Sequence, residues 1–250
     1  DRNLLVFSSN DPSTPNVSVE IKTDVKAFAK VAFVPNPIDF GVVRLGLNEV
    51  LCTISNSGGT RLNVTSLALD PAAPEGFGLS NMPQLYISAD NPFYLDVEES
   101  AQFVVYHEST EELEAYTELI INSNDEESGL ITVPVSIKVA EPEIEVTPEE
   151  LDFAGVDITE TLERDCTVKN IGAYPLTISK FEFGAVTDDY EFTVAPPATP
   201  IVLNQNEEVT VSVLYSPDEN SPDFGSLVID SDDADEEHVI VQFINDGSPP

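Results

Sequence analysis

The segment Cys52-Thr53-Ile54-Ser55-Asn56-Ser57-Gly58 decides the fold, because the chain contains it twice. The second version is Cys166-Thr167-Val168-Lys169-Asn170-Ile171-Gly172, 114 residues further on. In both segments inward and outward residues alternate and then give way to asparagine and glycine. This pattern is typical of a strand with one buried face that ends in a turn. The chain is therefore built from repeated, strand-rich units.

A second element supports the repeat and extends it. Residues 119–125, Leu-Ile-Ile-Asn-Ser-Asn-Asp, match residues 227–233, Leu-Val-Ile-Asp-Ser-Asp-Asp, and a third version opens the chain at residues 5–12. In the two full repeats this element stands near the end of the unit. Residues 1–30 therefore resemble the last hairpin of a preceding module.

Another shared element differs by one residue between the repeats. Asp39-Phe40-Gly41-Val42 returns as Asp152-Phe153-Ala154-Gly155-Val156. We expect a β-bulge to absorb the inserted residue.

The repeats predict an all-β fold of tandem immunoglobulin-like β-sandwiches, with one sandwich over residues 33–140 and another over 143–246. About seven short strands are expected in each, with turns every 8 to 12 residues. The linker at 140–143 holds one proline and no Gly/Ser tract, so we expect restricted motion between the sandwiches. The clearest strands are expected at 62–67, 101–106, 119–122, 131–139, 176–181, 209–215, 227–230 and 239–244.

Composition excludes several classes of protein. Among 250 residues, 46 are acidic and 10 are basic, which gives a formal net charge of −36. Such a chain lacks the basic surface needed to bind nucleic acid through phosphates. No apolar run approaches the roughly 18 residues that span a bilayer.

At these residues the chain resembles a known family. Residues 38–42, then Asn56-x-Gly58 with Leu62-x-Val64, then Tyr215-Ser216-Pro217, follow the order seen in ASH-type repeats. These are immunoglobulin-like domains named after the abnormal-spindle and Hydin proteins. They are related to the major sperm protein fold and are common in bacterial "choice-of-anchor D" surface proteins. The resemblance implies a structural, scaffolding or adhesive role and supplies no catalytic residues.

The chemically reactive side chains indicate no enzyme. Cys52 and Cys166 occupy equivalent inward positions in separate repeats, so we expect two buried free thiols rather than a disulfide. His107 and His238 lie in different repeats without ligands at zinc spacing, and we expect both at the surface or at a strand edge. No nucleophile elbow or phosphate-binding loop is present. We therefore predict no catalytic residues and no organic cofactor.

One acidic turn is a candidate calcium site. Carboxylates that could supply oxygen ligands are concentrated between residues 230 and 237, and the equivalent turn at 124–127 is also acidic. The spacing does not match an EF-hand, so a solvated acidic turn is the alternative. The candidate ligands are Asp230, Asp232, Asp233 and Asp235.

The N-terminal hairpin is the candidate assembly site. Its alternation predicts an exposed apolar face that a partner should cover, and unpaired strand edges beside it. Two interpretations remain open: a module cut from a longer array, or a donor segment that completes a sheet on a neighbouring copy. The face is made by Leu5, Phe7, Val17, Val19 and Ile21.

Together these features predict a non-enzymatic surface protein that acts as a stalk, spacer or filament subunit. We expect protein partners, with a homo-oligomer or filament among them, and an extracellular or cell-surface location, such as a prokaryotic envelope. One alternative is a module that binds calcium or a basic protein through its acidic loops. Another is an intracellular scaffold of the ciliary or centrosomal type.

Overall fold

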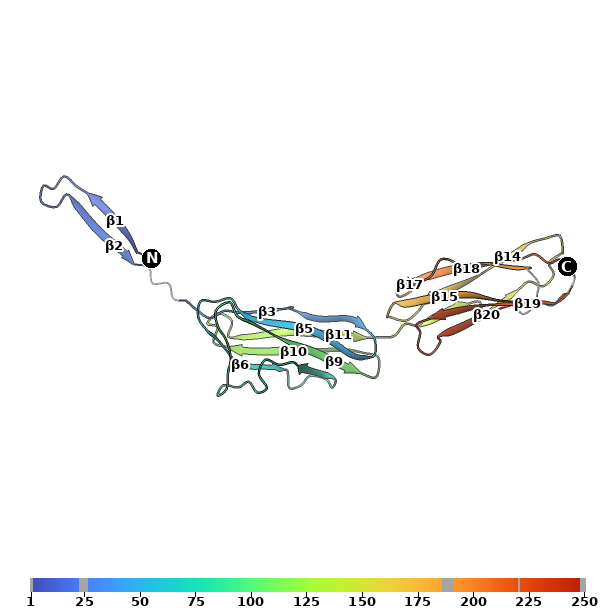
Figure 1. Cartoon of the computed structure of the whole chain (residues 1–250), viewed down its shortest axis with the longest axis horizontal. Helices are drawn as coiled ribbons and strands as arrows, with labels where there is room; N and C mark the ends of the chain where they lie inside the picture. Colours follow the sequence, from blue (N-terminus) through green and yellow to red (C-terminus); the bar gives the residue numbers. More distant parts are fainter. Residues whose placement is uncertain (1, 23–26, 186–190, 220, 248–250) are drawn as a thin grey trace.

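A computed structural model describes residues 2–22, 27–185, 191–219 and 221–247. The strands form three separate groups: a two-stranded hairpin and two β-sandwiches that follow one another along an elongated chain (Figure 1). Each sandwich has its own apolar core. The predicted all-β fold is confirmed.

The N-terminal hairpin consists of β1 (Arg2–Ser8) and β2 (Asn16–Lys22), paired antiparallel with Ser8 opposite Asn16. No third strand pairs with it within the described residues. Figure 1 shows the hairpin standing apart from the first sandwich.

The first sandwich packs a four-stranded sheet, in the order β3-β5-β9-β7, against a five-stranded sheet, in the order β4-β11-β10-β6-β8. Pairing is antiparallel except that β4 runs parallel to β11. The strands are β3 (Val31–Val34), β4 (Ile38–Val43), β5 (Gly46–Asn56), β6 (Leu62–Leu69), β7 (Phe77–Ser80), β8 (Phe93–Leu95), β9 (Ser100–Ser109), β10 (Leu113–Ser123) and β11 (Leu130–Val139).

The second sandwich repeats this plan. Its sheets have the orders β12-β14-β18-β16 and β13-β20-β19-β15-β17, and β13 runs parallel to β20. The strands are β12 (Ile144–Thr147), β13 (Glu150–Asp152), β14 (Leu162–Asn170), β15 (Leu176–Ala185), β16 (Phe192–Ala195), β17 (Ile201–Leu203), β18 (Glu208–Tyr215), β19 (Asp223–Ser231) and β20 (His238–Asn245).

The alternating segments that predicted the fold form the cores. Cys52 and Ile54 on β5, and Cys166 and Val168 on β14, are completely buried between the sheets. Each large aliphatic side chain buried in this way contributes about 1.5 to 3 kcal/mol of transfer free energy. Both cysteines are free thiols, as predicted, and burial raises the pKa of each to about 11.

The predicted number of strands was too low. The described residues contain nine strands in each sandwich, because short strands such as β7, β8 and β17 complete the sheets. Strands of three or four residues are too short to show a period of two in the sequence.

The predicted bulge lies in the other repeat. In the first sandwich the β4–β11 register shifts between Ser136 and Lys138, opposite Gly41, whose φ is 70°. In the second sandwich β13 ends at Asp152, so the inserted residue falls after the strand. A bulge accommodates an extra residue only while pairing continues on both sides of it.

Candidate functional site: the module joint and the exposed hairpin

A Ser-Asn-Asp turn joins β10 to β11 and holds the first sandwich together at one end. The Ser123 hydroxyl accepts the Asp125 N–H at 3.3 Å, and Asn124 Oδ1 accepts the N–H of Asn63 on β6 at 2.7 Å. Asp125, only 7% exposed, accepts the N–H of Val31 on β3 at 2.9 Å. The turn therefore ties the hairpin to β6 in its own sheet and to β3 in the opposite sheet.

The turn between β19 and β20 does the same in the second sandwich. The Ser231 hydroxyl accepts the Asp233 N–H at 3.2 Å, and Asp232 Oδ1 accepts the Thr177 N–H at 2.6 Å. Asp233 Oδ2 accepts the Ile144 N–H at 2.8 Å. Burial acts to raise the pKa of Asp233, but the N–H donors outweigh burial and hold the pKa below its usual value.

Asn170, at the end of β14, organises the start of the second sandwich. Its buried amide donates to the carbonyls of Tyr174 at 2.8 Å and Leu203 at 2.9 Å. Its oxygen accepts the N–H groups of Gly172 at 2.9 Å and Glu143 at 3.3 Å. The asparagine of the repeated Asn-x-Gly motif therefore holds the end of the linker in position.

Asn56 and Gly58 play the same part in the first sandwich. Asn56 donates to the Thr60 and Leu95 carbonyls and accepts the Gly58 N–H at 3.0 Å. A Cβ at Gly58 would lie 2.3 Å from the carbonyl oxygen of Phe28, so the backbone can pass this closely only at glycine.

Arg44, just after β4, joins the two sandwiches. Its Nε and Nη2 donate to Glu141 Oε2 in the linker at 2.9 and 2.6 Å. Nη2 also donates to the carbonyl of Asp232 at 3.0 Å, and the guanidinium lies 5.7 Å from the centre of the Tyr174 ring. The hydrogen bond to Glu141 raises the pKa of Arg44, so the charge persists at any physiological pH.

The linker itself is held on the side of the first sandwich. Glu141 Oε1 accepts the Leu45 N–H at 2.8 Å, and Glu112 Oε1 accepts the Glu141 N–H at 2.6 Å. Sequence reasoning missed Arg44, although it is one of only 10 basic residues in the chain.

The four aspartates predicted as calcium ligands do not all gather. Asp230 contacts His238 Nδ1 at 2.9 Å, and Asp232 binds Thr177 and Arg44. Only Asp233 and Asp235 lie together.

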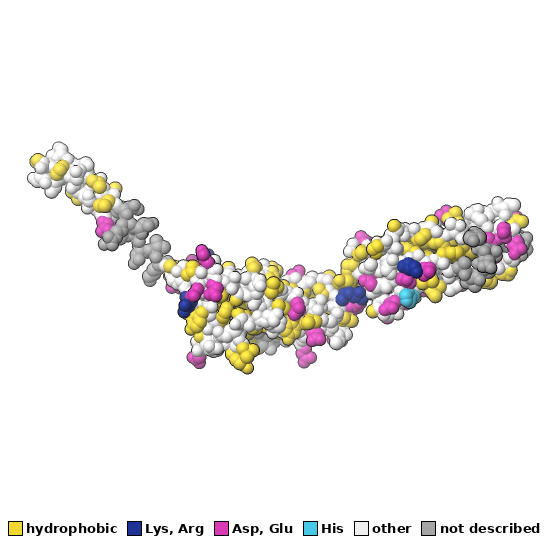
Figure 2. All heavy atoms as spheres, in the orientation of Figure 1, with side chains coloured by type: hydrophobic (Ala, Val, Ile, Leu, Met, Phe, Trp, Pro, Cys, Tyr) yellow, Lys and Arg dark blue, Asp and Glu magenta, His cyan; other side chains and the backbone are white. Residues whose placement is uncertain are grey.

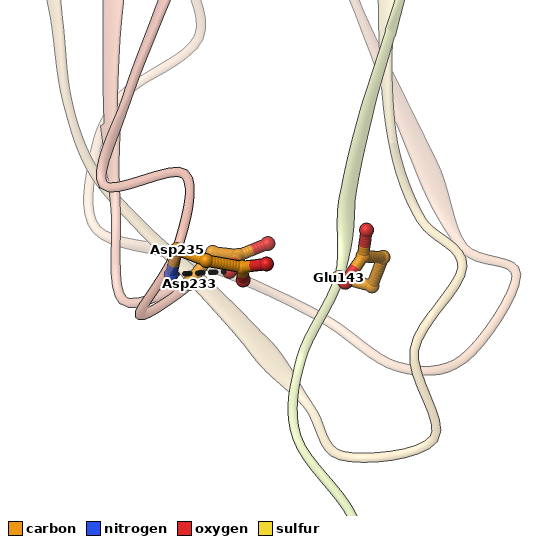
Figure 3. A group of neighbouring side chains, drawn as sticks. All are labelled: Glu143, Asp233 and Asp235. Carbon is orange, nitrogen blue, oxygen red and sulfur yellow. Dashed lines mark hydrogen bonds between the residues drawn. The ribbon is translucent and has the colours of Figure 1, made fainter.

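Asp233 and Asp235 are joined by Glu143, which the sequence reasoning did not include. The three residues each offer an oxygen within 4.8 Å of the others, and the two aspartates point toward Glu143 on the facing segment (Figure 3). Burial and the charge of Asp233 raise the pKa of Glu143, and a hydrogen bond with Asp233 raises the pKa of Asp235. Glu143 lies in the linker, and only the folded structure brings the linker close to the β19–β20 turn. No local sequence pattern signals this contact.

The turn of the N-terminal hairpin is a third copy of the Ser-Asn-Asp turn. The Ser9 hydroxyl accepts the Asp11 N–H at 3.3 Å, and Asp11 Oδ1 accepts the Ser13 and Thr14 N–H groups. Asp11 Oδ2 accepts only the Thr14 hydroxyl, at 3.2 Å, within the described residues. The Asn10 side chain has no hydrogen bond in that part of the chain.

The predicted apolar face of this hairpin is exposed. Leu5 lies opposite Val19, and Phe7 lies opposite Val17, so the four side chains share one face. Each is between 46% and 55% exposed. Ile21 continues the row in register opposite Asn3, but its side chain lies outside the described residues.

The two histidines lie in different environments. His238 is exposed, as predicted, whereas His107 is 1% exposed and contacts Phe77 edge-on at 4.5 Å between ring centroids. The prediction for His107 was wrong because β7, the short strand that covers it, was not recognised. Burial lowers its pKa, and neither ring nitrogen has a hydrogen-bond partner in the described structure.

A buried polar network closes the far end of the second sandwich. The Tyr215 hydroxyl donates to Asp223, and Asn245 Nδ2 donates to the Tyr215 oxygen at 2.5 Å. Glu191, 6% exposed, accepts the Asp218 N–H at 2.6 Å. Burial raises the pKa of Glu191 to about 7; the Asp218 N–H opposes the shift and the neighbouring Asp223 carboxyl adds to it.

Residues 142–242 match the family model described as "HYDIN/CFA65/VesB-like, Ig-like domain". The second sandwich matches this family model over most of its length. The resemblance to ASH-type, Hydin-like repeats is thereby confirmed for this part of the chain, and the first sandwich shares the strand order of this Ig-like domain. No curated protein matches the chain.

Several solved structures resemble this chain at low sequence identity and with TM-scores below 0.5. A Porphyromonas gingivalis protein of unknown function is 14% identical, with a TM-score of 0.36; 86% of this chain and 99% of that one are covered. The ASH/PapD-like domain 7 of human CEP192 is 13% identical, with a TM-score of 0.30 and coverage of 48% and 90%. The Vibrio cholerae VesB protease is 17% identical, with a TM-score of 0.31 and coverage of 44% and 31%.

Figure 2 shows acidic side chains scattered over both sandwiches rather than gathered in one patch, and apolar side chains exposed on the hairpin. Within the described residues, no helix is long and apolar enough to cross a membrane.

Proposed function

We propose that this chain is a non-enzymatic structural or adhesive protein, in which tandem Ig-like sandwiches act as a stalk, a spacer or a filament subunit. The observation that carries the proposal is the joint at Arg44. One side chain binds the linker through Glu141 and the next sandwich through Asp232, so it fixes the angle between modules. A fixed angle gives a stalk a defined length and direction.

The proposed location is extracellular or on a cell surface, in particular a prokaryotic envelope. The net charge of −36 supports a surface that repels like copies and stays soluble, a repulsion that salt screens. Proteins are the proposed partners, and assembly into a homo-oligomer or filament would proceed through residues 1–30, the segment that contains the exposed hairpin β1–β2. An intracellular scaffold is the alternative that the family resemblance alone suggests.

The test of the spacer role is the Arg44→Ala variant. Loss of this partly buried, multiply bonded cation should weaken the joint by about 1 to 2 kcal/mol, which raises the population of other inter-sandwich angles about 5- to 30-fold. Nitroxide labels on Gln102→Cys and Thr210→Cys, both exposed strand positions in different sandwiches, report the distribution of distances by electron paramagnetic resonance. We expect one narrow distribution in the parent chain and a broad one in the variant.

Arg61→Ala is the matched control. Arg61 also binds a carboxylate, Asp96 at 2.7 Å, and also lies over an aromatic ring, Tyr94 at 5.6 Å, but all three residues belong to the first sandwich. Its removal should leave the inter-sandwich distances unchanged. A broad distribution in the parent chain itself would count against a rigid spacer.

A second candidate function is cation binding by Glu143, Asp233 and Asp235. The observation in its favour is that the three carboxylates converge from the linker and from the β19–β20 turn. Calcium prefers oxygen ligands of this kind, and an ion here would fasten the turn to the linker. The same acidic surface could instead receive a basic protein.

Calorimetry with calcium chloride and with EDTA tests this candidate. Binding should raise the melting temperature of the second sandwich, by an amount equivalent to about 2.7 kcal/mol when the free ion is at 100 times its dissociation constant. Asp235→Asn should abolish the rise, whereas Glu236→Gln, an exposed neighbour outside the group of three, should keep it. Equal melting temperatures in calcium and EDTA would reject the site.

A further inference from the structure

We propose that the hairpin formed by residues 2–22 is the final hairpin of an Ig-like sandwich of this same type, and that its partner is a set of strands equivalent to β3–β9 that lacks its own final hairpin. The proposal rests on the protein-binding role given to this hairpin above. It names an incomplete Ig-like module as the partner in place of a second copy of this chain, because both sandwiches of this chain already contain their final hairpins, β10–β11 and β19–β20. The partner is thus a β-sheet surface with defined backbone donors, rather than any apolar surface.

The geometry of the hairpin is that of β10–β11. Ser8 pairs with Asn16 as Asn122 pairs with Leu130, at a constant shift of 114 residues. The turns that follow have equal lengths, and each is closed by a bond from its first N–H to its last carbonyl: Ser9 to Pro15 at 2.7 Å, and Ser123 to Gly129 at 2.7 Å. Hairpin β19–β20 has the same register and turn.

The apolar face of the hairpin matches positions that are buried in both sandwiches. At the same shift, Leu5 corresponds to Leu119 and Val19 to Val133, both 0% exposed in the first sandwich. The second sandwich buries Leu227 and Val241 in the same way. In each sandwich the opposite, four-stranded sheet covers these side chains. Among the described residues, no such sheet covers the hairpin.

The turn of the hairpin has two acceptors with no backbone donor in the described structure. In the sandwiches, Asn124 and Asp232 accept an N–H from β6 or β15. Asn10 holds the same place in the hairpin. Oδ2 of Asp125 accepts an N–H from β3, and Oδ2 of Asp233 accepts one from β12. The equivalent Oδ2 of Asp11 accepts no N–H within the described residues.

These acceptors favour an Ig-like sheet over a second copy of the hairpin. Two hairpins packed face to face would cover Leu5, Phe7, Val17 and Val19, but they would bring no strand N–H to Asn10 or Asp11. The strands of an incomplete module supply both the apolar cover and the two donors, in the same arrangement that the chain already shows twice.

The experiment adds strands of this type in front of the full 250-residue sequence. A second copy of residues 27–114 is fused before Asp1, so that the constant shift keeps the hairpin in register with the added strands. A second fusion uses residues 141–222, taken from the other sandwich. Hydrogen exchange measured by mass spectrometry follows the amides of β1 and β2. We expect exchange in at least one fusion to be slower than in the parent chain by on the order of 1000-fold, as for strands within a folded module.

Asn10 variants test the specific recognition. In the fusion, Asn10→Ala leaves the N–H from the β6-type strand without its acceptor. The substitution should therefore speed up hydrogen exchange in the hairpin by about 10-fold or more. Asn10→Asp should keep the protection, because Asp232 performs this task in the second sandwich. Neither substitution should alter exchange in the parent chain, where the side chain has no described partner.

Two results would overturn the proposal. One is unchanged hairpin exchange in both fusions. The other is a dimer of the parent chain at micromolar concentration, detected by sedimentation, in which β1 and β2 become protected; a second copy would then be the partner. Neither result affects the spacer role, which is tested independently by the distances between the sandwiches in the Arg44 variant.

Discussion

Asn170→Ala is expected to lower the free energy of unfolding of the second sandwich by about 3 to 5 kcal/mol. The side chain is 0% exposed and serves four backbone groups, two carbonyls and two N–H groups. Alanine cannot replace any of these bonds, and each group left buried without a partner costs about 1 to 3 kcal/mol unless water reaches it. Urea unfolding followed by hydrogen exchange measures the second sandwich separately from the first.

Asn204→Ala is the matched control for this prediction. Asn204 lies on the same sandwich and is exposed, and among the described residues its side-chain amide donates only to Glu207, at 3.0 Å. Its loss should cost less than about 0.5 kcal/mol. If the two alanine variants lose similar stability, the role assigned to Asn170 in holding the linker and β17 is wrong.

The second large effect concerns pH and the buried carboxyl of Glu191. Its pKa in the folded protein is about 7, above the ordinary value of 4.5, because burial disfavours the charged form. A raised carboxyl pKa means that the folded state binds the proton more tightly than the unfolded state. The stability that this proton supplies is present below pH 4.5 and is lost as the pH rises through 7.

The loss amounts to on the order of 3 kcal/mol between pH 4.5 and pH 8. Glu191→Gln should remove this dependence, because glutamine stays neutral and keeps an oxygen for the Asp218 N–H. The measured quantity is the difference in unfolding free energy between the variant and the parent chain across this pH range. Glu163→Gln, at an exposed position, should show no such trend. A constant difference between pH 5 and pH 8 would refute the role of Glu191.

Much of the fold could be predicted because the repeat marks the long central strands twice. The alternation through Cys52 and Ile54 identified the buried face of β5, and the same pattern at Cys166 identified that of β14. Short edge strands could not be predicted, because three or four residues hold too little pattern. His107 shows the consequence: only the sheet order reveals that β7 covers it.

The candidate site could be predicted only where it is local. The apolar face of the hairpin follows from alternation within one strand pair, and the register brings Leu5, Phe7, Val17 and Val19 together. The joint depends on contacts between residues far apart in the sequence, such as Arg44 with Asp232. Glu143 could not be predicted as part of the acidic group for the same reason. Asp230 was predicted as part of it but contacts His238 on the neighbouring strand instead.

The parallel pairing of β4 with β11, and of β13 with β20, determines how each sandwich would respond to a pulling force along the proposed stalk. The chain enters a sandwich close to the start of one of these strands and leaves it from the end of the other. Tension along a stalk therefore draws the two strands past each other in opposite directions. The bonds between them are loaded in shear and share the force, instead of opening one at a time from an end. Forced unfolding is governed by the unfolding rate, so this arrangement favours a tether that resists being pulled apart.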